Sequence, residues 1–569
     1  MKPNEEKTLY IEEKYVVGVD FGSDSVRAAV VSTIDGRIAG NGVAYYPRWK
    51  EGLYQHPERN IFRQHPLDYL ESFEACVKEA LSELPQEARK NVVGIGVDTT
   101  GSTPVPVNRE GVPLALTEGF ETYENAMFYL WKDHSAAAEA EEIDRAFSGG
   151  GQDYGKYQGR YSAEWFWAKM LHAVRTDVRV REAAYTWLEH CDWMVGTLCG
   201  NTRPEEIYHS ACAAGHKALW HSEWNGLPSA QILGSVDPCL ALVRERYGKA
   251  PRPAATLAGY LTEEWAQKLG LSKGISVSGS SFDAHAGAVG AGIREKTIVC
   301  TLGTSAVDML VEKAEALEGK DIRRFGGAAE HSILPGYVGI ETGQAAFGDI
   351  FGWFKRVLLW PLEQTGRFLD EETCHRLCQQ MEDVMLAELQ RQAAQLRDDV
   401  FPIALDWFNG RRYPDTDDSR RAVIAGLTLG TQAPAIFRAL VFGAVCGLKR
   451  IVDGFEAAGL VIEKVVAVGG ISKKSAYVMQ MMADVLDKKI EILDADQTCA
   501  LGAAIYAAVA SGAYEDVQQA SAHMAAKCIG EFAPQKERVE FYRRQYREYL
   551  RLTQLADVWE EQAAGNKCL

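Results

Sequence analysis

Two stretches of the chain repeat one pattern of apolar and polar positions. Residues 16–31, VVGVDFGSDSVRAAVV, place two β-branched apolar runs on either side of a short turn, and residues 297–312, TIVCTLGTSAVDMLVE, follow the same order. Each stretch predicts a strand, a polar turn and a second strand, and their similarity indicates an internal duplication. The turns contain Asp20, Gly22, Ser23 and Ser25 in the first stretch, and Gly303, Thr304 and Ser305 in the second.

The remaining hydrophobic periodicity predicts strands that alternate with helices. In the first half we expect a helix over 67–83, a buried strand over 92–98 followed by a polar turn, and a strand, turn and small-residue helix over 275–292. In the second half we expect a strand near 337–341 and helices over 374–397 and 432–456. Residues 465–493 should form a strand, a Gly-Gly turn, a helix and a second strand. A small-residue helix over 496–512 and a charged helix within 534–569 should follow. This alternation predicts an α/β fold with mostly parallel or mixed sheets.

The length of the chain favours two domains. A single hydrophobic core seldom serves 569 residues, so we expect two large domains, at residues 1–290 and 291–569. Each would begin close to one of the repeated strand–turn–strand stretches. Because no low-complexity linker separates the two halves, we expect them to pack closely around a shared cleft.

Charge and composition limit the class of partner. The formal net charge of −17 disfavours binding to the phosphate backbone of a nucleic acid, although loop amides and metal ions can still hold a small anion. The N-terminus has no signal-peptide core, and apolar runs such as 439–448 are too short to span a bilayer, so we expect a soluble cytoplasmic protein without a membrane partner. Cys374 and Cys378 flank His375 at helical spacing, but no second cluster completes a zinc site, so free thiols are the favoured interpretation.

The polar turns have the composition of a nucleotide site. A nucleoside triphosphate needs amides and hydroxyls near its phosphates, a carboxylate that helps to hold Mg²⁺, and a pocket for the base. The two repeated turns offer the first two features, and the Gly469–Gly470 turn lets a flat ring approach the backbone. A single Asp-x-Gly turn is weak evidence, because both residues are common in turns, and GAVGAG at 287–292 is weaker still as a dinucleotide motif. The argument rests on the order of the turns along the chain.

With these turns and the segments between them, the chain resembles the FGGY carbohydrate kinases of the actin-like ATPase superfamily. The resemblance runs through GVDFGSDSVRA, GVDTTGSTP, NAMFYLWKDH, SFDAHAGAVGAG, GTSAVD, GIETGQAAFGDIFGWF, AVGGISKK and DQTCALGAAI. Two further segments, AGHKALWH and LDWFNGRR, are typical of the L-ribulokinase group within the family. The resemblance implies two ribonuclease-H-like domains that flank an interdomain cleft.

The resemblance also implies roles for residues on the nucleotide side. Asp20 would serve Mg²⁺ and the phosphates, within the turn of Gly22, Ser23 and Ser25. Gly303, Thr304 and Ser305 would face the β- and γ-phosphates, while Gly469, Gly470 and Lys473 would border the adenosine. For Asp20 the structural alternative is an aspartate that caps a turn.

On the sugar side, the resemblance implies that Asp283 is the catalytic base, which accepts the proton of the attacking hydroxyl. The structural alternative is an aspartate that caps the following helix. Trp131 and Asp133 would line the sugar pocket, Gly101 and Ser102 would contact the carbonyl end of the sugar, and Lys217 and Glu341 would bind its oxygens. A surface lysine and a structural carboxylate are the alternatives for the last two. The roles of Asn409, Arg411 and Arg412 stay open, and the arginines are equally consistent with salt bridges that hold their loop.

The expected reaction is the phosphorylation of L-ribulose by ATP with Mg²⁺, as in L-arabinose breakdown, by a cytoplasmic homodimer. A kinase for D-ribulose, L-xylulose or another polyol is the first alternative. A non-catalytic sugar or nucleotide sensor is the second, and the presence of Asp20 and Asp283 argues against it. An actin-like or chaperone ATPase is the third, and the aromatic segment 120–220 argues against it.

Overall fold

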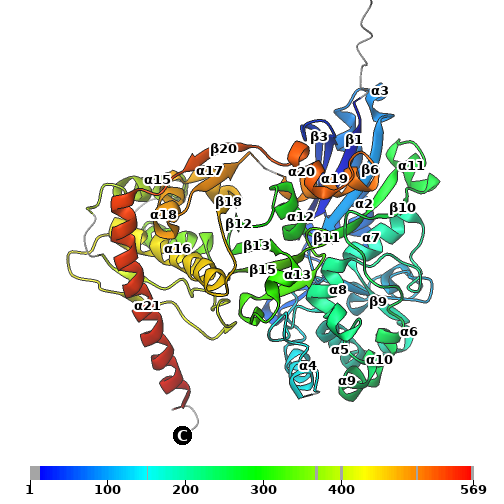
Figure 1. The fold of residues 1–569 in the computed structure, drawn as a ribbon, viewed down its shortest axis with the longest axis horizontal. Helices are drawn as coiled ribbons and strands as arrows, with labels where there is room; N and C mark the ends of the chain where they lie inside the picture. The colour runs from blue at the N-terminus through cyan, green and yellow to red at the C-terminus, as the bar shows by residue number, and fades with distance from the viewer. Residues whose placement is uncertain (1–12, 150, 365–369, 398–400, 495–496, 566–569) are drawn as a thin grey trace, which may run out of the picture. The chain divides into compact units, whose positions relative to one another are not determined.

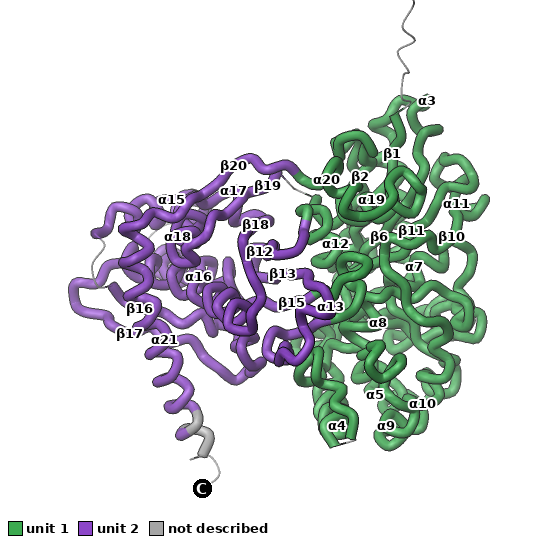
Figure 2. Tube along the Cα trace, viewed as in Figure 1, with its two compact units in different colours: residues 1–292, 329–339, 497–526 green, residues 293–328, 340–496, 527–569 purple. Residues whose placement is uncertain are grey.

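The computed structural model describes residues 13–149, 151–364, 370–397, 401–494 and 497–565 (Figure 1). The chain forms two compact units (Figure 2). Unit 1 comprises Met1–Gly292, Ala329–Gly339 and Gln497–Ala526, and unit 2 comprises Ile293–Ala328, Ile340–Asp496 and Lys527–Leu569. Later segments of the chain therefore complete the first unit. The predicted domain boundary between residues 290 and 291 stays a prediction.

A six-stranded sheet forms the centre of unit 1, in the order β10-β11-β6-β1-β2-β3. β1 pairs antiparallel with β2 and parallel with β6, and β11 pairs parallel with β6. The parallel register places Asp20 opposite Asp98, and Phe282 opposite Thr99. The strands are β1 (Tyr15–Phe21), β2 (Ser25–Ser32), β3 (Ile38–Tyr45), β6 (Val92–Thr99), β10 (Leu257–Tyr260) and β11 (Ser276–Phe282).

Glycines on the sheet let a distant helix approach closely. α19 (Thr498–Ala510) packs on β1 and β6, and Figure 1 shows this orange helix beside the blue strands. A Cβ atom on Gly18 would lie 1.8 Å from the carbonyl oxygen of Ala500, and one on Gly96 would lie 2.2 Å from that of Ala503. The small-residue helix predicted at 496–512 is thus a helix whose backbone lies directly against the sheet.

The other face of the sheet is covered by α2 (Pro66–Ser82), which packs on β2 and β3 where a helix was predicted over 67–83. A second apolar cluster of unit 1 contains Trp167 and Trp187, so much of the aromatic segment serves as core. The remaining helices of unit 1 are α1 (Pro47–Lys50), α3 (Gln86–Arg89), α4 (Ala137–Gly149), α5 (Phe166–Thr176), α6 (Val178–Ala183), α7 (His190–Cys199), α8 (Ala211–Ala218), α9 (Ala230–Val236), α10 (Pro238–Glu245), α11 (Glu263–Leu269), α12 (Asp283–Gly290) and α20 (Val517–Met524). Short strands are β4 (Gln55–His56), β5 (Ile61–Gln64), β7 (Pro104–Val107), β8 (Phe128–Tyr129) and β9 (Thr186–Glu189).

The second sheet repeats the strand order of the first. Its order is β14-β15-β13-β12-β18-β19-β20. Five neighbouring strands of this sheet, β15-β13-β12-β18-β19, correspond one by one to the strands β3-β2-β1-β6-β11 of the first sheet. As in unit 1, the first strand of the repeat, β12, pairs antiparallel with the next strand and parallel with a later one, β18. The strands are β12 (Thr297–Leu302), β13 (Ala306–Glu312), β14 (Gly327–Glu330), β15 (Val338–Gln344), β18 (Lys464–Val468), β19 (Ile490–Leu493) and β20 (Cys528–Phe532), with β16 (Ile403–Ala404) and β17 (Ile424–Ala425) outside this sheet.

The helices of unit 2 include those predicted over 374–397 and 432–456, within 465–493 and within 534–569, whereas the helix over 348–363 was not predicted. They are α13 (Ala314–Leu317), α14 (Gly348–Glu363), α15 (Glu371–Ala393), α16 (Ala433–Ala457), α17 (Gly470–Lys474), α18 (Ala476–Leu486) and α21 (Lys536–Gly565). α16 is almost wholly buried over Phe437–Leu448, which accounts for its continuous apolar sequence. Within the ranges described, no helix is long and apolar enough to cross a membrane.

Candidate active site

Three aspartates gather at one edge of the sheet in unit 1. Asp20 lies near the end of β1, Asp98 near the end of β6, and Asp283 begins α12 directly after β11. Because these three strands are parallel, their carboxyl ends meet at the same edge. Burial raises the pKa of Asp98 well above its ordinary value, and the charges of Asp20 and Asp283 raise it further. Burial also raises the pKa of Asp20, against the opposing effects of Asp98 and Arg27.

This arrangement has the chemistry of a site for a hard cation. Carboxylate oxygens are the ligands that Mg²⁺ prefers, and a divalent ion relieves the repulsion between buried acids. Asp20 is 8% exposed and Asp98 is fully buried, so water screens their charges poorly. The donor set of Asp20 and Asp98 therefore fits Mg²⁺.

Asp283 is the first residue of α12, and Phe282 holds the N-cap position. The carboxylate of Asp283 accepts a hydrogen bond from the amide of Ala284 at 2.7 Å. The side chain is half-buried, so part of it stays accessible at the end of the sheet. A helix-terminal role and a chemical role are thus both compatible with this position.

The turn after β1 is joined to the loop that carries Trp131. Within the turn, the amide of Gly22 donates to the carbonyl oxygen of Ser25 at 2.9 Å. The indole nitrogen of Trp131 donates to the hydroxyl oxygen of Ser23 at 2.9 Å, and Gln64 donates to the Ser23 carbonyl at 2.6 Å. The structure therefore brings together a residue expected at the phosphates and one expected at the sugar.

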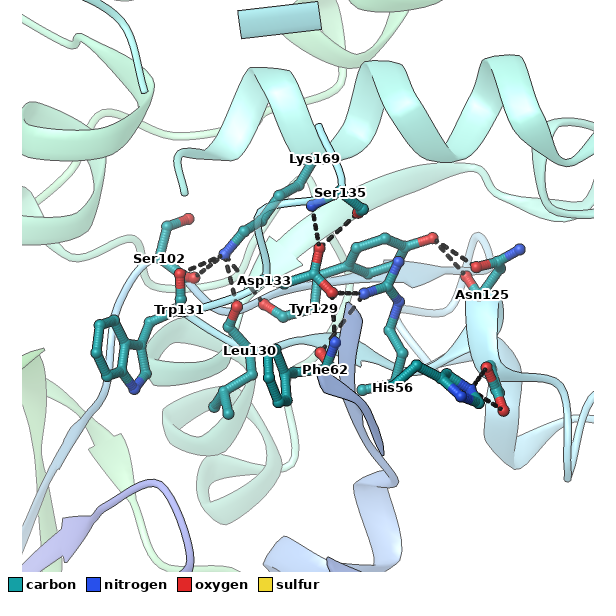
Figure 3. A network of polar contacts seen from close by, with 12 residues as sticks. His56, Phe62, Ser102, Asn125, Tyr129, Leu130, Trp131, Asp133, Ser135 and Lys169 are labelled. Atoms are coloured by element: carbon teal, nitrogen blue, oxygen red, sulfur yellow. Dashed lines mark hydrogen bonds and ion pairs between the residues drawn. The ribbon is translucent and has the colours of Figure 1, made fainter. Parts of the chain in front are cut away.

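Asp133 is fully buried in a network of donors (Figure 3). One carboxylate oxygen accepts from the amide of Phe62 at 2.7 Å and from the guanidinium of Arg63. The other accepts from the amide and the hydroxyl of Ser135, at 3.1 and 2.5 Å. The Arg63 guanidinium also stacks over the Tyr129 ring, 3.5 Å from its centroid. The described contacts make Asp133 the anchor of the loop that follows Trp131.

Lys169, on α5, binds two loops at once. Its ammonium donates to the carbonyl oxygens of Ser102 and Leu130, each at 2.8 Å, and to that of Trp131 at 3.2 Å (Figure 3). Lys169 is fully buried, and burial lowers the pKa of its ammonium. A single cation thus fixes the backbones of two segments predicted to contact the sugar.

Glu189, the last residue of β9, binds the same turn from its other side. It accepts a hydrogen bond from the hydroxyl of Ser102 and one from the amide of Thr103, the latter at 2.8 Å. Burial raises the pKa of the Glu189 carboxyl, and the hydrogen bonds from Ser102 and Thr103, followed by the Lys169 ammonium, oppose that effect. Lys169 and Glu189 form a buried pair of opposite charge around Ser102.

Gly101 and Lys217 both lie against Phe282, the residue that precedes Asp283. A Cβ atom on Gly101 would lie 1.8 Å from the Phe282 ring, so only glycine fits there. Lys217, on α8, places its ammonium 5.8 Å from the centroid of the same ring and 5.4 Å from that of Trp165. Lys217 is 9% exposed, so the alternative of an ordinary surface lysine does not describe it.

In unit 2 the turn after β12 is held by the start of α14. The amide of Gly303 donates to the Ser305 carbonyl at 3.0 Å, as Gly22 does in the first turn. The Gly303 carbonyl accepts from the amide of Gly348 at 3.0 Å, and the Thr304 carbonyl accepts from that of Phe347 at 2.8 Å. Thr304 itself is exposed. The turn is rigid in its backbone and open at its side chains.

The two glycines after β18 differ in their surroundings. Gly469 has a φ of +94°, and a Cβ atom there would lie 2.6 Å from the carbonyl oxygen of Leu302. A Cβ atom on Gly470 would meet no atom within 4 Å. Lys473 lies one turn further along α17, with its ammonium 3.4 Å from Asp494. Gly469 is thus required by the fold, whereas Gly470 leaves open space.

Glu341, Arg411 and Arg412 differ in how well the structure defines their roles. Glu341 is a half-buried residue of β15. Arg411 forms a 2.7 Å ion pair with Asp557 of α21, while Arg412 is exposed. The alternative that an arginine holds its loop by a salt bridge therefore describes Arg411.

Two domain models of one family match the chain. The N-terminal domain of the FGGY family of carbohydrate kinases matches residues 15–290, and the C-terminal domain of that family matches residues 298–511. The chain belongs to the FGGY family of carbohydrate kinases. A protein of Vibrio parahaemolyticus named Ribulokinase is 42% identical over 530 residues, 93% of this chain and 93% of that protein. A Ribulokinase of Halalkalibacterium halodurans is 34% identical over 554 residues, 95% of this chain and 94% of that protein.

Solved structures of sugar kinases share the fold of this FGGY kinase. A xylulose kinase from Rhodospirillum rubrum has a TM-score of 0.77 at 20% identity, over 96% of this chain and 99% of that one. The match to a glycerol kinase from Plasmodium falciparum with ADP has a TM-score of 0.73 at 15% identity, over 96% and 98% of the two chains. The predicted α/β class with two ribonuclease-H-like domains is confirmed. As a carbohydrate kinase, the protein uses ATP and a sugar as substrates.

Sequence reasoning missed four residues of this FGGY kinase that the geometry brings to the site. Asp98 had a recognisable signal, because GIGVD at 94–98 repeats the strand ending VVGVD at 16–20. Arg63, Lys169 and Glu189 had none, since their partners come from distant segments of the chain. The assignments of individual site residues to ATP, sugar or metal stay predictions.

Proposed function

We propose that this FGGY kinase transfers the γ-phosphoryl group of ATP to the 5-hydroxyl of L-ribulose, giving ADP and L-ribulose 5-phosphate. One observation carries the proposal: the two relatives described above, which match along almost the whole chain, are named Ribulokinase. The bond that forms joins the sugar oxygen to the γ-phosphorus, and the bond that breaks joins this phosphorus to the β–γ bridging oxygen. We place the reaction in the breakdown of L-arabinose.

In this proposal Asp283 accepts the proton of the attacking hydroxyl. A carboxylate at the end of the sheet, half-buried and next to two further acids, suits a general base. Asp20 and Asp98 would hold Mg²⁺, which neutralises charge that develops on the phosphates. The mutual repulsion of the three acids supports both roles, because it favours the binding of a cation and the uptake of a proton.

For the sugar we propose contacts from Gly101, Ser102, Trp131, Lys217 and Glu341. Lys217 supplies a positive donor for a ketose oxygen, and Trp131 offers an apolar face to the carbon chain. Asp133 acts by holding the Trp131 loop, because its oxygens already accept four hydrogen bonds from the protein. Fixed loops suit a site that distinguishes sugars by single hydroxyl groups.

For ATP we propose that Gly22, Ser23, Ser25, Gly303, Thr304 and Ser305 bind the phosphates. Gly469, Gly470 and Lys473 would border the adenosine. The support comes from the two similar turns, in which the amide of Gly22 and the amide of Gly303 each donate a hydrogen bond across the turn. The open space at Gly470 supports the adenosine position.

We further propose domains at 1–290 and 291–569, a cytoplasmic location and a homodimer. The free thiols among the described cysteines are typical of a reducing compartment.

The helix α21 supports the proposed homodimer. Its residues Leu555, Val558 and Trp559 are 68, 51 and 66% exposed, and their i, i+3 and i+4 spacing places them on one helix face. Light scattering of the wild type and of Trp559→Glu tests this interface.

The reaction is tested by identifying its product. After incubation with Mg²⁺-ATP and L-ribulose, we expect a phosphate ester whose ³¹P NMR signal couples to the protons on C5. Omission of Mg²⁺ should abolish the product. ATP hydrolysis without a sugar phosphate, or phosphorylation at another carbon, would contradict the proposed reaction.

A further inference from the structure

A buried group of one cysteine and two histidines lies in unit 1. Cys212 and His216 are four residues apart on α8, so they share one face of that helix. His285 lies in the first turn of α12. One ligand atom from each residue lies within 4.8 Å of the other two, and the three residues are 2, 1 and 1% exposed. Among the residues that the structure describes, no other three histidines, cysteines or acids come together in this way.

The donor set is that of a transition-metal site. A thiolate and two imidazoles are ligands that Zn²⁺ prefers, whereas Mg²⁺ and Ca²⁺ prefer oxygen. The two rings are inclined by 61° with centroids 4.7 Å apart, so they are not stacked face to face. Around Zn²⁺, neighbouring N and S ligand atoms are about 3.3–3.8 Å apart, so the group needs a contraction of at most about 1 Å.

We propose that Cys212, His216 and His285 bind a Zn²⁺ ion. The Cys212 thiolate offsets part of the charge of the ion, which matters because a buried net charge is costly. The thiol loses its proton to solvent when the metal binds.

The position of the site gives the ion a consequence for the sugar site, which rests on the proposed function. His216 directly precedes Lys217 on α8, and His285 follows Asp283 by two residues on α12. A shared ion would therefore link the helix that carries the proposed sugar-binding lysine to the helix that begins with the proposed base. The ion would stabilise the spacing of these two groups without contacting the substrate.

The test measures metal binding to the full-length protein. Metal-free protein is titrated with Zn²⁺ in competition with a chromophoric chelator, and separately with Co²⁺, whose thiolate charge-transfer band reports sulfur ligation. We expect a single equivalent to bind in the wild type with this band present. Cys212→Ser should abolish the band. Cys76→Ser is the matched control, because Cys76 is an equally buried thiol of the same unit, on α2.

The outcomes separate this site from the kinase reaction. Absence of stoichiometric Zn²⁺ binding in the wild type, or an unchanged cobalt band in Cys212→Ser, would overturn the site. If Cys212→Ser fails to fold, His216→Asn provides a second comparison: its Zn²⁺ affinity should fall, and an affinity equal to that of the wild type would overturn the site. Metal binding is read without turnover, so a failure of the proposed sugar kinase reaction leaves this result unaffected.

Discussion

Lys169 and Glu189 bind the same residue, Ser102, through different groups. The Lys169 ammonium donates to the backbone carbonyl of Ser102 at 2.8 Å, and the Ser102 hydroxyl donates to the Glu189 carboxylate. Both charged side chains are buried, so each compensates the other where water cannot. The pair fixes the turn that is proposed to hold the carbonyl end of the sugar.

The first prediction concerns Lys169→Met. The change removes the donor shared by Ser102, Leu130 and Trp131, so the two sugar loops lose their common anchor. We expect the KM for L-ribulose to rise about 10- to 100-fold, with the KM for ATP nearly unchanged. Initial-rate kinetics with each substrate varied in turn provide the measurement. Lys268→Met is the control, since Lys268 is exposed and pairs only with Glu264 among the described salt bridges. An unchanged sugar KM in folded Lys169→Met would refute the positioning role.

The second prediction concerns the proposed base. In Asp283→Asn the acceptor for the hydroxyl proton is lost while the shape of the side chain is kept. We expect turnover to fall about 10²- to 10⁴-fold, with ATP and L-ribulose still bound, as measured by calorimetry. Asp237→Asn is the control for helix capping, because Asp237 caps α10 and accepts from the amide of Cys239 at 2.9 Å. Near-normal turnover of Asp283→Asn would rule out the base assignment.

The third prediction compares two adjacent glycines. Gly470→Val should leave the melting temperature close to that of the wild type, because open space surrounds this position, but it should raise the KM for ATP several-fold. Gly469→Ala should instead lower stability by about 1–3 kcal/mol, since it adds a Cβ atom at positive φ beside the Leu302 carbonyl. Thermal unfolding and ATP saturation curves separate the two effects. If Gly470→Val leaves the ATP KM unchanged, the adenosine does not lie there.

The fourth prediction concerns Asp308, a fully buried residue of β13 that pairs across the sheet with Cys300. Burial raises the pKa of Asp308 to about 7. Because the folded state holds this proton more tightly than the unfolded state, stability should fall as the pH rises from about 4 to about 7. Across this pH range, the full pKa shift lowers the free energy of unfolding by about 4 kcal/mol.

Asp308→Asn removes the loss of stability that ionisation of the buried Asp308 carboxyl causes. We expect the variant to gain stability over the wild type at about pH 8 and to show little gain at about pH 4, as measured by urea unfolding. Asp321→Asn, at an exposed aspartate of the same unit, should show no such dependence. A gain that is equal at both pH values would show that the proton of Asp308 is not responsible.

The fold could be predicted because its signals are local. The β-branched runs around 16–31 and 297–312 form paired strands, and the small-residue pattern over 498–510 forms a helix that needs glycines opposite it. What the sequence did not indicate is which unit that helix joins. α19 packs on β1, almost the whole chain length away, and only tertiary structure reveals such a pairing.

The candidate site was predictable where its residues stand in turns. Asp20 lies near the end of an apolar strand and Asp283 follows a strand rich in glycine and serine, and the resemblance to FGGY kinases pointed to their roles. Lys169 and Glu189 were not predictable in the same way, because nothing in a single buried lysine or glutamate indicates its partner. Their importance comes from contacts with carbonyl and hydroxyl groups whose positions depend on the folded backbone.

The most direct test of the proposed function is the rate of ADP release with Mg²⁺-ATP across a panel of sugars. The panel contains L-ribulose, D-ribulose, L- and D-xylulose, L-rhamnulose, L-fuculose and glycerol. We expect the highest kcat/KM with L-ribulose. A higher value with another sugar would identify a sister kinase. ADP release that no sugar changes, or no release at all while ATP still binds, would contradict the account.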